Sequence, residues 1–382
     1  MPNLPSPGEL LIYDYRGEFQ LYPNKAIKVL QWNVERNYKS DEIIETIKRL
    51  DPDIAIIQEI DINCKRSGNI DHMEKMCKEL RLKGGFVAEF FELESPIRQD
   101  RDQVSYGQSH IFLKTQLTTA FQGGGVHGNA IFSKFDMEFR VVDHKHHPFD
   151  WEKDGDALRE PRVGRRYSLA AHVKHDGLPP MLCYCVHLEV FCGIIGRVSA
   201  FSDILKDSRE NWTTIPHQMI FGDLNTMAHS IARLSPKYAR DRYRFLSLGK
   251  QESQWWNDNV FGWQDTDGPL NLKLYFYGYN WLYRFYKWYC QLVYGKIINP
   301  IWPCFSGFPQ EVLREARNPG FTDCWPSNMT TLTNYSGLFK ARLDWTLTSS
   351  NFDVIEMEIG NSDYAASDHA YLMVHIRPRQ TG

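Results

Sequence analysis

Met219-Ile220-Phe221-Gly222-Asp223-Leu224-Asn225 is the stretch that decides the fold. It is an apolar run that stops at a glycine and passes directly into a carboxylate and an amide. In extended chain, residues two apart share a face, so the side chains of Asp223 and Asn225 are expected to point the same way. A single segment of this kind is often no more than a turn. Its recurrence along the chain makes it informative.

Other apolar runs also end or begin beside polar side chains suited to chemistry. These side chains are Asn33, Glu35, Glu59, His187, Asp344, Asp368 and His369. If the strand ends lie along one edge of layered sheets, five carboxylates converge there. Clustered carboxylates cannot all stay ionised without a counter-charge, and a hard divalent cation such as Mg²⁺ supplies one through oxygen ligands. The pattern therefore fits metal-assisted phosphoryl chemistry.

Short β-leaning segments alternate with a few amphipathic helices along the whole chain. We expect strands over residues 27–32, 54–57, 130–132, 167–173, 181–186, 218–221, 343–347, 354–359 and 371–376. Helices are expected over residues 40–50, with Ser40 as the N-cap, 71–82 and 193–209. Many strands with interspersed helices in one undivided chain predict an α/β layered domain with two packed sheets.

Three stretches read as insertions. Residues 92–127 and 143–165 are polar and turn-rich, whereas residues 228–318 hold six of the eleven tryptophans. Within the last stretch, residues 281–294 are expected to form a helix with one narrow polar stripe. Two interpretations stay open: this helix packs onto the domain, or Trp281 and Trp288 make a peripheral membrane contact.

Composition narrows the class of protein. The 382 residues include 44 basic and 47 acidic ones, and 42% are hydrophobic, which is ordinary for a folded chain. The near balance of charge argues against non-specific coating of nucleic acid, although a nuclease with a local basic groove stays open. No apolar run has signal-peptide length, and no window offers about 18 uncharged apolar residues. We therefore expect no signal peptide, no transmembrane segment and an intracellular, cytoplasmic or peripheral-membrane location.

Two groups of basic side chains can each be interpreted in two ways. Arg165 and Arg166 precede an expected strand and are either solvated or in contact with a substrate phosphate. His144, His146 and His147 are spaced closely enough to suggest zinc. Solvated loop histidines are the favoured interpretation.

The ordered set of motifs resembles the endonuclease/exonuclease/phosphatase superfamily. The motifs span residues 31–35, 57–59, 128–133, 186–189, 222–225, 342–344 and 367–369. The resemblance covers residues 27–376, nearly the whole chain. It implies a single domain over residues 1–382, built as a four-layer α/β sandwich of the DNase-like kind. It also implies a metal-dependent phosphoric ester hydrolase with its site at one edge of two central sheets.

The resemblance implies a role for each catalytic candidate. Asp223 matches the residue that activates the attacking water, and Asn225 the residue that holds a phosphate oxygen or that water. His369 matches the residue that stabilises the phosphorane-like charge, and Asp344 orients it. His187 matches a phosphate-contacting position. These roles suit the residue types, because a carboxylate accepts a proton and an imidazolium donates one.

The resemblance also implies a metal site. Glu59 matches the Mg²⁺ ligand, with Asn33 and Glu35 nearby, and Asp368 matches a second carboxylate on the metal side. Mn²⁺ is an alternative cation, and one or two ions both suit the set. The aromatic insertion favours a phospholipid or membrane-adjacent phosphoester. A nucleic acid or nucleic-acid adduct is the alternative substrate, and a catalytically inactive scaffold is a third interpretation.

Overall fold

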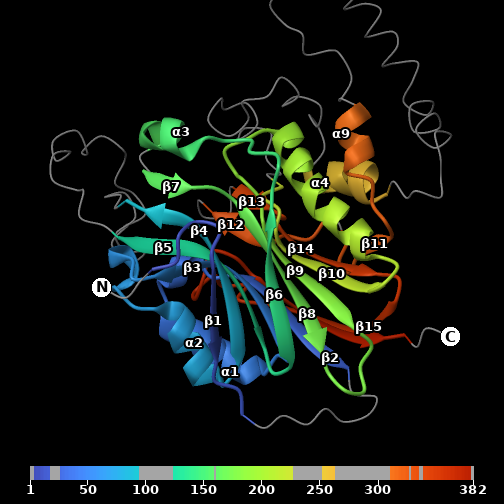
Figure 1. Cartoon of the computed structure of the whole chain (residues 1–382), viewed down its shortest axis with the longest axis horizontal. Helices are drawn as coiled ribbons and strands as arrows, with labels where there is room; N and C mark the ends of the chain where they lie inside the picture. The colour runs from blue at the N-terminus through green and yellow to red at the C-terminus, as the bar shows by residue number, and fades with distance from the viewer. Residues whose placement is uncertain are drawn as a thin grey trace, which may run out of the picture.

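The computed structural model describes residues 4–17, 26–93, 124–158, 161–226, 252–262, 310–326, 328–334 and 339–379. Two β-sheets dominate these ranges and pack face to face (Figure 1). A separate two-stranded sheet pairs β12 (Leu332–Asn334) with β13 (Phe339–Ala341).

The larger sheet has eight strands in the described ranges, ordered β1-β4-β5-β3-β2-β16-β15, with β7 paired to β4 off this path. Its strands are β1 (Leu10–Asp14), β2 (Ile27–Asn33), β3 (Ile54–Ile62), β4 (Lys83–Glu92), β5 (Gly125–Ser133), β7 (Arg162–Gly164), β15 (Phe352–Gly360) and β16 (Tyr371–Pro378). Strands β2 and β3 run parallel and are connected through α1 (Ser40–Leu50). β16 pairs antiparallel to β2 on its other side.

The smaller sheet has six strands in the described ranges, ordered β11-β14-β10-β9-β8-β6. They are β6 (Asp136–Asp143), β8 (Tyr167–Lys174), β9 (Met181–His187), β10 (His217–Asp223), β11 (Phe321–Asp323) and β14 (Asp344–Ser349). Strands β9 and β10 run parallel and are connected through α4 (Ile194–Asn211), and β14 is antiparallel to β10.

Helices cover the outer face of each sheet, so the molecule has four layers (Figure 1). On the larger sheet lie α1 and α2 (His72–Leu80), which bury Ile43, Ile47 and Met76. On the smaller sheet lie α4, α6 (Glu252–Trp256), the π-helical η3 (Asn257–Phe261) and α9 (Gln310–Glu315). Each large apolar side chain buried in these layers contributes about 1.5–3 kcal/mol. The expected four-layer α/β sandwich is confirmed.

The topology gathers particular strand ends at one edge of the sandwich. Parallel strands joined by a helix end at the same edge, so β2 ends beside β3 and β9 ends beside β10. Because β14 is antiparallel to β10 and β16 is antiparallel to β2, both strands begin at that edge. The polar residues that follow or precede these strands are therefore placed together by the chain path alone.

Several local expectations are corrected. Ser40 lies inside α1, and Lys39 occupies the N-cap without a side-chain capping bond. The turn-rich stretch 143–165 contains α3 (Trp151–Leu158) and β7, because Trp151 is buried among aromatic side chains despite the polar composition around it. Residues 92 and 125–127 belong to strands β4 and β5. In the ranges that the structure describes, the other short helices are η1 (Glu35–Asn37) and η2 (Lys65–Ser67).

The aromatic insertion is described only at residues 252–262 and 310–318. Trp255 and Trp256 are buried on the outer face of the smaller sheet, and Glu252 forms a buried ion pair with Arg197 of α4. The expected helix over 281–294, with Trp281 and Trp288, lies outside the described residues. In the described part of the chain, no helix is long and apolar enough to cross a membrane.

Candidate functional site

Strand register sets the backbone of the candidate site. Asp223, the last residue of β10, is the register partner of His187 on one side and of Asp344 on the other. In the facing sheet, Asn33 ends β2 beside Gln58 of β3. The structure thus brings residues from both sheets to the same edge, as the strand-end pattern predicted.

A β-bulge places Glu59. The register of β3 against β5 shifts between Ile57 and Ile60, and Glu59 within the bulge has a φ of 62°. In strict alternation Glu59 would share the outer face with Ile57, which packs in the layer of α1 and α2. The bulge instead brings its carboxylate within 3.2 Å of Asn33 Nδ2. The left-handed conformation costs about 1–2 kcal/mol in a non-glycine residue, so packing must hold it.

Asn33 bridges two carboxylates from different sheets. Its Nδ2 donates to Glu59 Oε1 at 3.2 Å and to Asp223 Oδ2 at 3.1 Å. Its Oδ1 accepts the backbone N–H of Glu35 at 3.1 Å, which fixes the amide orientation. The side chain is fully buried. Because both N–H groups point at carboxylates, Asn33 holds the two acids at a set separation.

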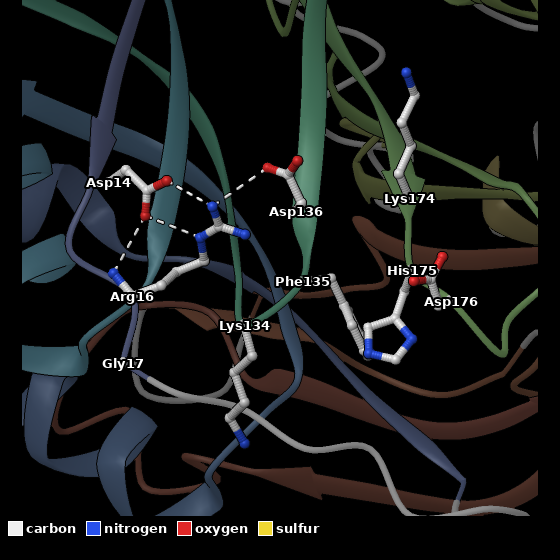
Figure 2. A pocket seen from close by; sticks show the side chains of 9 residues that line it. All are labelled: Asp14, Arg16, Gly17, Lys134, Phe135, Asp136, Lys174, His175 and Asp176. Carbon is white, nitrogen blue, oxygen red and sulfur yellow. Dashed lines mark hydrogen bonds and ion pairs between the residues drawn. The ribbon is translucent and has the colours of Figure 1, made fainter.

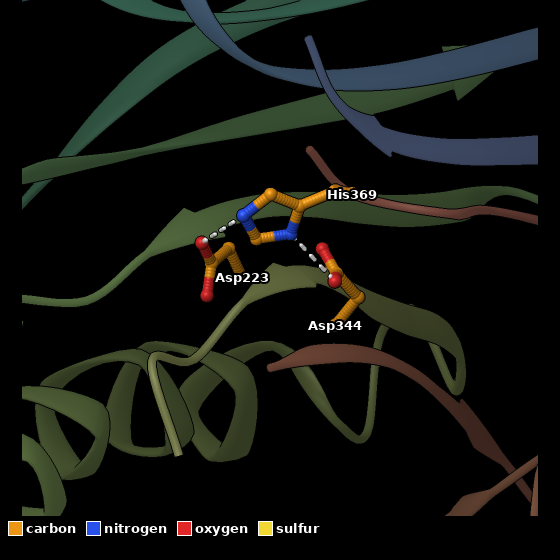
Figure 3. Close-up of side chains that lie close together, drawn as sticks. All are labelled: Asp223, Asp344 and His369. Atoms are coloured by element: carbon orange, nitrogen blue, oxygen red, sulfur yellow. Dashed lines mark hydrogen bonds and ion pairs between the residues drawn. The ribbon is translucent and has the colours of Figure 1, made fainter. Parts of the chain in front are cut away.

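Asp344 and His369 form a buried pair that faces Asp223 (Figure 3). His369 Nδ1 lies 2.8 Å from Asp344 Oδ2, while His369 Nε2 lies 3.8 Å from Asp223 Oδ2. A carboxylate only accepts, so Nδ1 carries a proton. Burial opposes a charged His369, but the charge and hydrogen bond of Asp344, joined by the charges of Asp368 and Asp223, together raise the pKa of His369 well above its ordinary value.

The second oxygen of Asp344 is held from the other sheet. Gln31 Nε2 donates to Asp344 Oδ1 at 2.9 Å and to Gln58 Oε1 at 2.8 Å. Both glutamines are fully buried. The sequence analysis missed them, although an amide inside an apolar strand run is a visible signal of a buried polar network.

The surroundings of Asp223 disfavour its charged form. Burial raises the pKa of Asp223 to about 7, with His369 opposing the rise and Asp344 adding to it. The backbone N–H of Asn225 donates to Asp223 Oδ1 at 2.7 Å, so that oxygen is oriented. The side chain of Asn225 donates to the carbonyl of Leu188 at 2.8 Å.

His187 completes the inner cluster. Its Nε2 lies 3.6 Å from Asp223 Oδ2 and 3.9 Å from Glu59 Oε1. Burial alone would raise the pKa of Glu59, but the positive charges gathered around it, Arg36 and His369 among them, together lower that pKa well below its ordinary range. Arg36 Nε lies 3.7 Å from Glu59 Oε2. Arg36, like Gln31 and Gln58, is absent from the site residues predicted from the sequence.

The two remaining predicted carboxylates lie at the rim. Glu35 Oε2 accepts the backbone N–H of Asp368 at 3.0 Å, which ties the loop after β2 to the loop before β16. Asp368 Oδ1 lies 3.9 Å from His369 Nε2. All nine predicted site residues are therefore linked through direct contacts, with Glu35 and Asp368 outermost.

The two groups of basic side chains depart from the expectation only in part, because His146 is half-buried and His147 is exposed. Only 10% of the Arg166 side chain is exposed, and it contacts Glu89 and His187, while Arg165 is paired with Asp143 at the surface. His144 is also buried, not solvated, and its Nε2 lies 2.9 Å from Ser168 Oγ.

Carboxylates and an imidazole at the site could serve as ligands for a divalent cation. Within the described ranges, Asp223, Asp344 and His369 offer ligand atoms that all lie within 4.8 Å of one another. However, His369 Nδ1 and Asp344 Oδ2 already satisfy each other. Hard cations prefer oxygen, and the two carboxylates bridged by Asn33, those of Glu59 and Asp223, supply it. A divalent cation fits the residues present, because burial and the neighbouring carboxylates of Asp344 and Glu59 raise the pKa of Asp223, and a cation would favour its charged form.

A hollow of about 560 Å³ lies elsewhere on the surface (Figure 2). It is lined by the end of β1 with the residues that follow it and by the β5–β6 and β8–β9 turns, and β9 reaches the candidate site only at its other end. Its cations are compensated: Arg16 pairs with Asp14, Lys134 with Asp51, and Lys174 with Glu138. The hollow therefore presents no strong field to an anionic substrate.

Comparison with known proteins gives one family and a consistent fold. The family model described as "Endonuclease/Exonuclease/phosphatase family" matches residues 30–369. The crystal structure of an endonuclease/exonuclease/phosphatase from Beutenbergia cavernae DSM 12333 is 14% identical, with 93% of this chain and 72% of that chain covered and a TM-score of 0.50. No curated protein sequence matches the chain.

Two further solved structures are similar at lower scores. The human Nocturnin catalytic domain with bound sulfate is 14% identical, covers 97% of each chain and has a TM-score of 0.43. Truncated Caenorhabditis elegans TDP2 is 13% identical, with 93% of this chain and 98% of that chain covered and a TM-score of 0.44.

Proposed function

The chain belongs to the endonuclease/exonuclease/phosphatase family, and from this premise we propose that it hydrolyses a phosphodiester with a divalent cation, Mg²⁺ or Mn²⁺. Members of the family are generally hydrolases that act on phosphoesters. The observation that carries the proposal is the Asp344–His369 pair facing Asp223 across 3.8 Å. This arrangement sets a proton donor and a proton acceptor on either side of one small volume.

Glu59 is the residue proposed to hold the cation, with the carboxylate of Asp223 in reach. When bound, the cation would neutralise charge on the phosphoryl oxygens and on the crowded carboxylates. Asn33 keeps the two acids apart at hydrogen-bond distances of 3.2 and 3.1 Å from its Nδ2. Glu35 and Asp368 are assigned to the rim, where they join two loops and add negative charge on the metal side.

Asp223 is the proposed general base. Its Oδ1 is held by the Asn225 N–H, and its Oδ2 faces the site. A carboxylate whose pKa is about 7 is well matched to accept a proton from water near neutral pH. Asn225 thus positions the base through its backbone, in addition to its predicted contact with a phosphate oxygen or the attacking water.

His369 and His187 are the proposed donors to the phosphoryl group. With Asp344 behind it, His369 stays protonated and donates from Nε2 to the oxygen on which negative charge develops. His187 Nε2 opens onto the same volume from the side of Glu59. Two N–H groups aimed at one developing charge are the form of stabilisation that phosphoester hydrolysis requires.

A substrate panel tests the proposal. Purified chain is incubated with bis(p-nitrophenyl) phosphate, single- and double-stranded oligonucleotides, a tyrosyl phosphodiester, sphingomyelin vesicles and phosphoinositide vesicles, with EDTA or with Mg²⁺. We expect Mg²⁺-dependent release of product from at least one diester, lost in Asp223→Ala and kept in the matched Asp176→Ala. Asp176 is an exposed acid in the β8–β9 turn, far along the strand from His187. Equal hydrolysis by wild type and Asp223→Ala would refute the assignment.

The panel also separates the two substrate classes. Preference for vesicles over oligonucleotides would support a lipid head group and a membrane-facing role for Trp281 and Trp288. Preference for an oligonucleotide or the tyrosyl diester would support nucleic acid or its adducts. No turnover on any diester, with the metal bound, would favour an inactive scaffold.

A further inference from the structure

The Nδ1 atom of His187 contacts an arginine side chain. Arg166 Nη1 lies 3.0 Å from His187 Nδ1 and 2.7 Å from Glu89 Oε2. The Arg166 side chain is only 10% exposed, and the Glu89 side chain is fully buried. The two N–H bonds of Nη1 can serve the imidazole and the carboxylate at once.

Further contacts hold this arginine in place. Its Nε lies 3.7 Å from Glu189 Oε2, and its guanidinium lies 5.1 Å from the ring centroid of Phe90. Glu189 is itself fixed, because Oε2 accepts from Trp151 Nε1 at 2.7 Å and Oε1 accepts from the Phe191 N–H at 3.0 Å. The guanidinium is therefore a rigid group and not a mobile surface cation.

The chemistry of the contact decides where His187 carries its proton. A guanidinium only donates hydrogen bonds, so Nδ1 of His187 must accept and be unprotonated. In the neutral ring the proton then lies on Nε2, which faces Asp223 Oδ2 at 3.6 Å and Glu59 Oε1 at 3.9 Å. Adding a proton to Nδ1 would set two donors against each other, so the same contact disfavours the imidazolium.

We propose that Arg166, held by Glu89, is a positioning residue that fixes the tautomer of His187, with Nδ1 as acceptor and Nε2–H as donor toward the phosphoryl oxygen. The inference deepens the proposed function and rests on it for the identity of the acceptor. Because its Nε2 lone pair is taken by the proton, His187 does not ligate the cation through that atom. Its role in the site is to donate a hydrogen bond.

The two histidines of the site, His369 and His187, thus have partners of opposite charge at Nδ1. Asp344 places an acceptor behind His369 and Arg166 places a donor behind His187. The first arrangement favours a charged ring and the second a neutral one. One edge of the sandwich thereby holds two imidazole donors near the same Asp223 oxygen, His187 Nε2 at 3.6 Å and His369 Nε2 at 3.8 Å, without two positive rings repelling each other.

The tautomer is tested directly by nitrogen NMR of the full chain labelled in histidine. We expect the His187 signals, assigned by their loss in His187→Ala, to show an unprotonated Nδ1 and a protonated Nε2. Arg166→Met should shift them toward a mixture of tautomers. A wild-type ring protonated on Nδ1 would overturn the proposal. This readout needs no turnover, so it stands apart from failure of the proposed function.

Kinetics on the best diester test the positioning role. Arg166→Met is expected to lower kcat about 10–100-fold with a smaller change in KM, as loss of an outer partner does. In a His187→Ala background the same substitution should cause no further loss. An equal loss in both backgrounds would show that Arg166 acts independently of His187, and the proposal would fail.

Two further variants guard against simple unfolding. Arg166→Met combined with Glu89→Gln removes the pair without leaving a buried carboxylate unpartnered, and it should show the same kcat loss with a cooperative thermal transition. Arg165→Met removes the neighbouring arginine, which pairs with Asp143 at the surface, and should retain wild-type kcat and His187 signals. A kcat loss in Arg165→Met as large as in Arg166→Met would count against the proposal.

Discussion

Asn33 Nδ2 and Asp223 Oδ2 lie 3.1 Å apart although 190 residues separate them in the chain. The bond joins the end of β2 in the larger sheet to the end of β10 in the smaller one. It spans the interface between the sheets, so the geometry of the candidate site depends on how the two sheets pack. Any change that shifts one sheet against the other should therefore alter the distances within the candidate site before it unfolds the chain.

Substitution of the proposed base is the first prediction. Asp223→Ala should lower kcat by about 10²–10⁴, equivalent to roughly 3–5.5 kcal/mol of barrier. Asp223→Asn should be as inactive but at least as stable as wild type in the absence of added metal, because it removes a crowded charge. Steady-state kinetics and thermal melts of both variants check this. A strongly destabilised Asp223→Asn would show that the carboxylate is structural.

The Asp344–His369 pair should act as one unit. Asp344→Asn and His369→Ala are each expected to lower kcat by about 10²–10⁴. Asparagine at position 344 no longer keeps the imidazole protonated, and alanine at position 369 removes the imidazole. The double variant should be no more than about two-fold worse than the poorer single variant. Single-turnover rates measure the comparison, and multiplicative losses would show that the two residues act separately.

Metal binding should be visible in stability as well as in turnover. Mg²⁺ at ten times its Kd is expected to stabilise the wild-type chain by about 1.4 kcal/mol, since it binds only the folded site. Glu59→Gln should need much more metal for the same rise in Tm. Melts of EDTA-treated protein across a Mg²⁺ series make the measurement. A rise in Tm that is unchanged in Glu59→Gln would place the cation elsewhere.

His144 predicts a pH dependence of stability that is separate from the active site. Burial lowers the pKa of His144 from 6.5 to about 4, with Asp203 opposing the shift. The folded state therefore binds the proton more weakly than the unfolded state, and stability is lost as pH falls from about 6.5 to 4. The difference is worth about 3 kcal/mol.

His144→Gln isolates this contribution, because glutamine can bond Ser168 but does not titrate in this range. Urea unfolding at pH 7 and at pH 4.5 should show a smaller loss of stability in His144→Gln than in wild type. His175→Gln, at the other end of the sheets, should keep the wild-type loss. Identical losses in His144→Gln and wild type would mean that His144 is solvated.

Part of this architecture could be predicted from local pattern. Apolar runs indicated where strands lie: the run from Gln218 to Phe221 falls within two residues of both ends of β10, whereas the run over 54–57 covers only the first part of β3. Polar residues at the ends of the expected strands led to nine predicted site residues. All nine lie in contact, since parallel strands joined by helices share an edge. Their chemical roles stay predictions until activity is measured.

Other features depended on contacts that no local pattern reports. The burial of Arg166 could not be predicted, because its partner Glu89 lies 77 residues earlier on another strand. The polar stretch around Trp151 was predicted as a turn-rich insertion, although its aromatic side chain anchors α3 in a buried cluster. The burial of the Arg166 and Trp151 side chains depends on contacts with residues that are distant in the sequence.

The sequence by itself determined the type of element, the layered class and the family, because strand periodicity and motif order are properties of the chain alone. The tertiary structure decided which donor faces which acceptor. Both histidines lie at strand ends in the sequence, but their Nδ1 atoms contact groups of opposite charge. His369 contacts the carboxylate of Asp344, and His187 contacts the guanidinium of Arg166. Protonation is set by charges within a few ångströms, and those charges come from strands that only folding brings together.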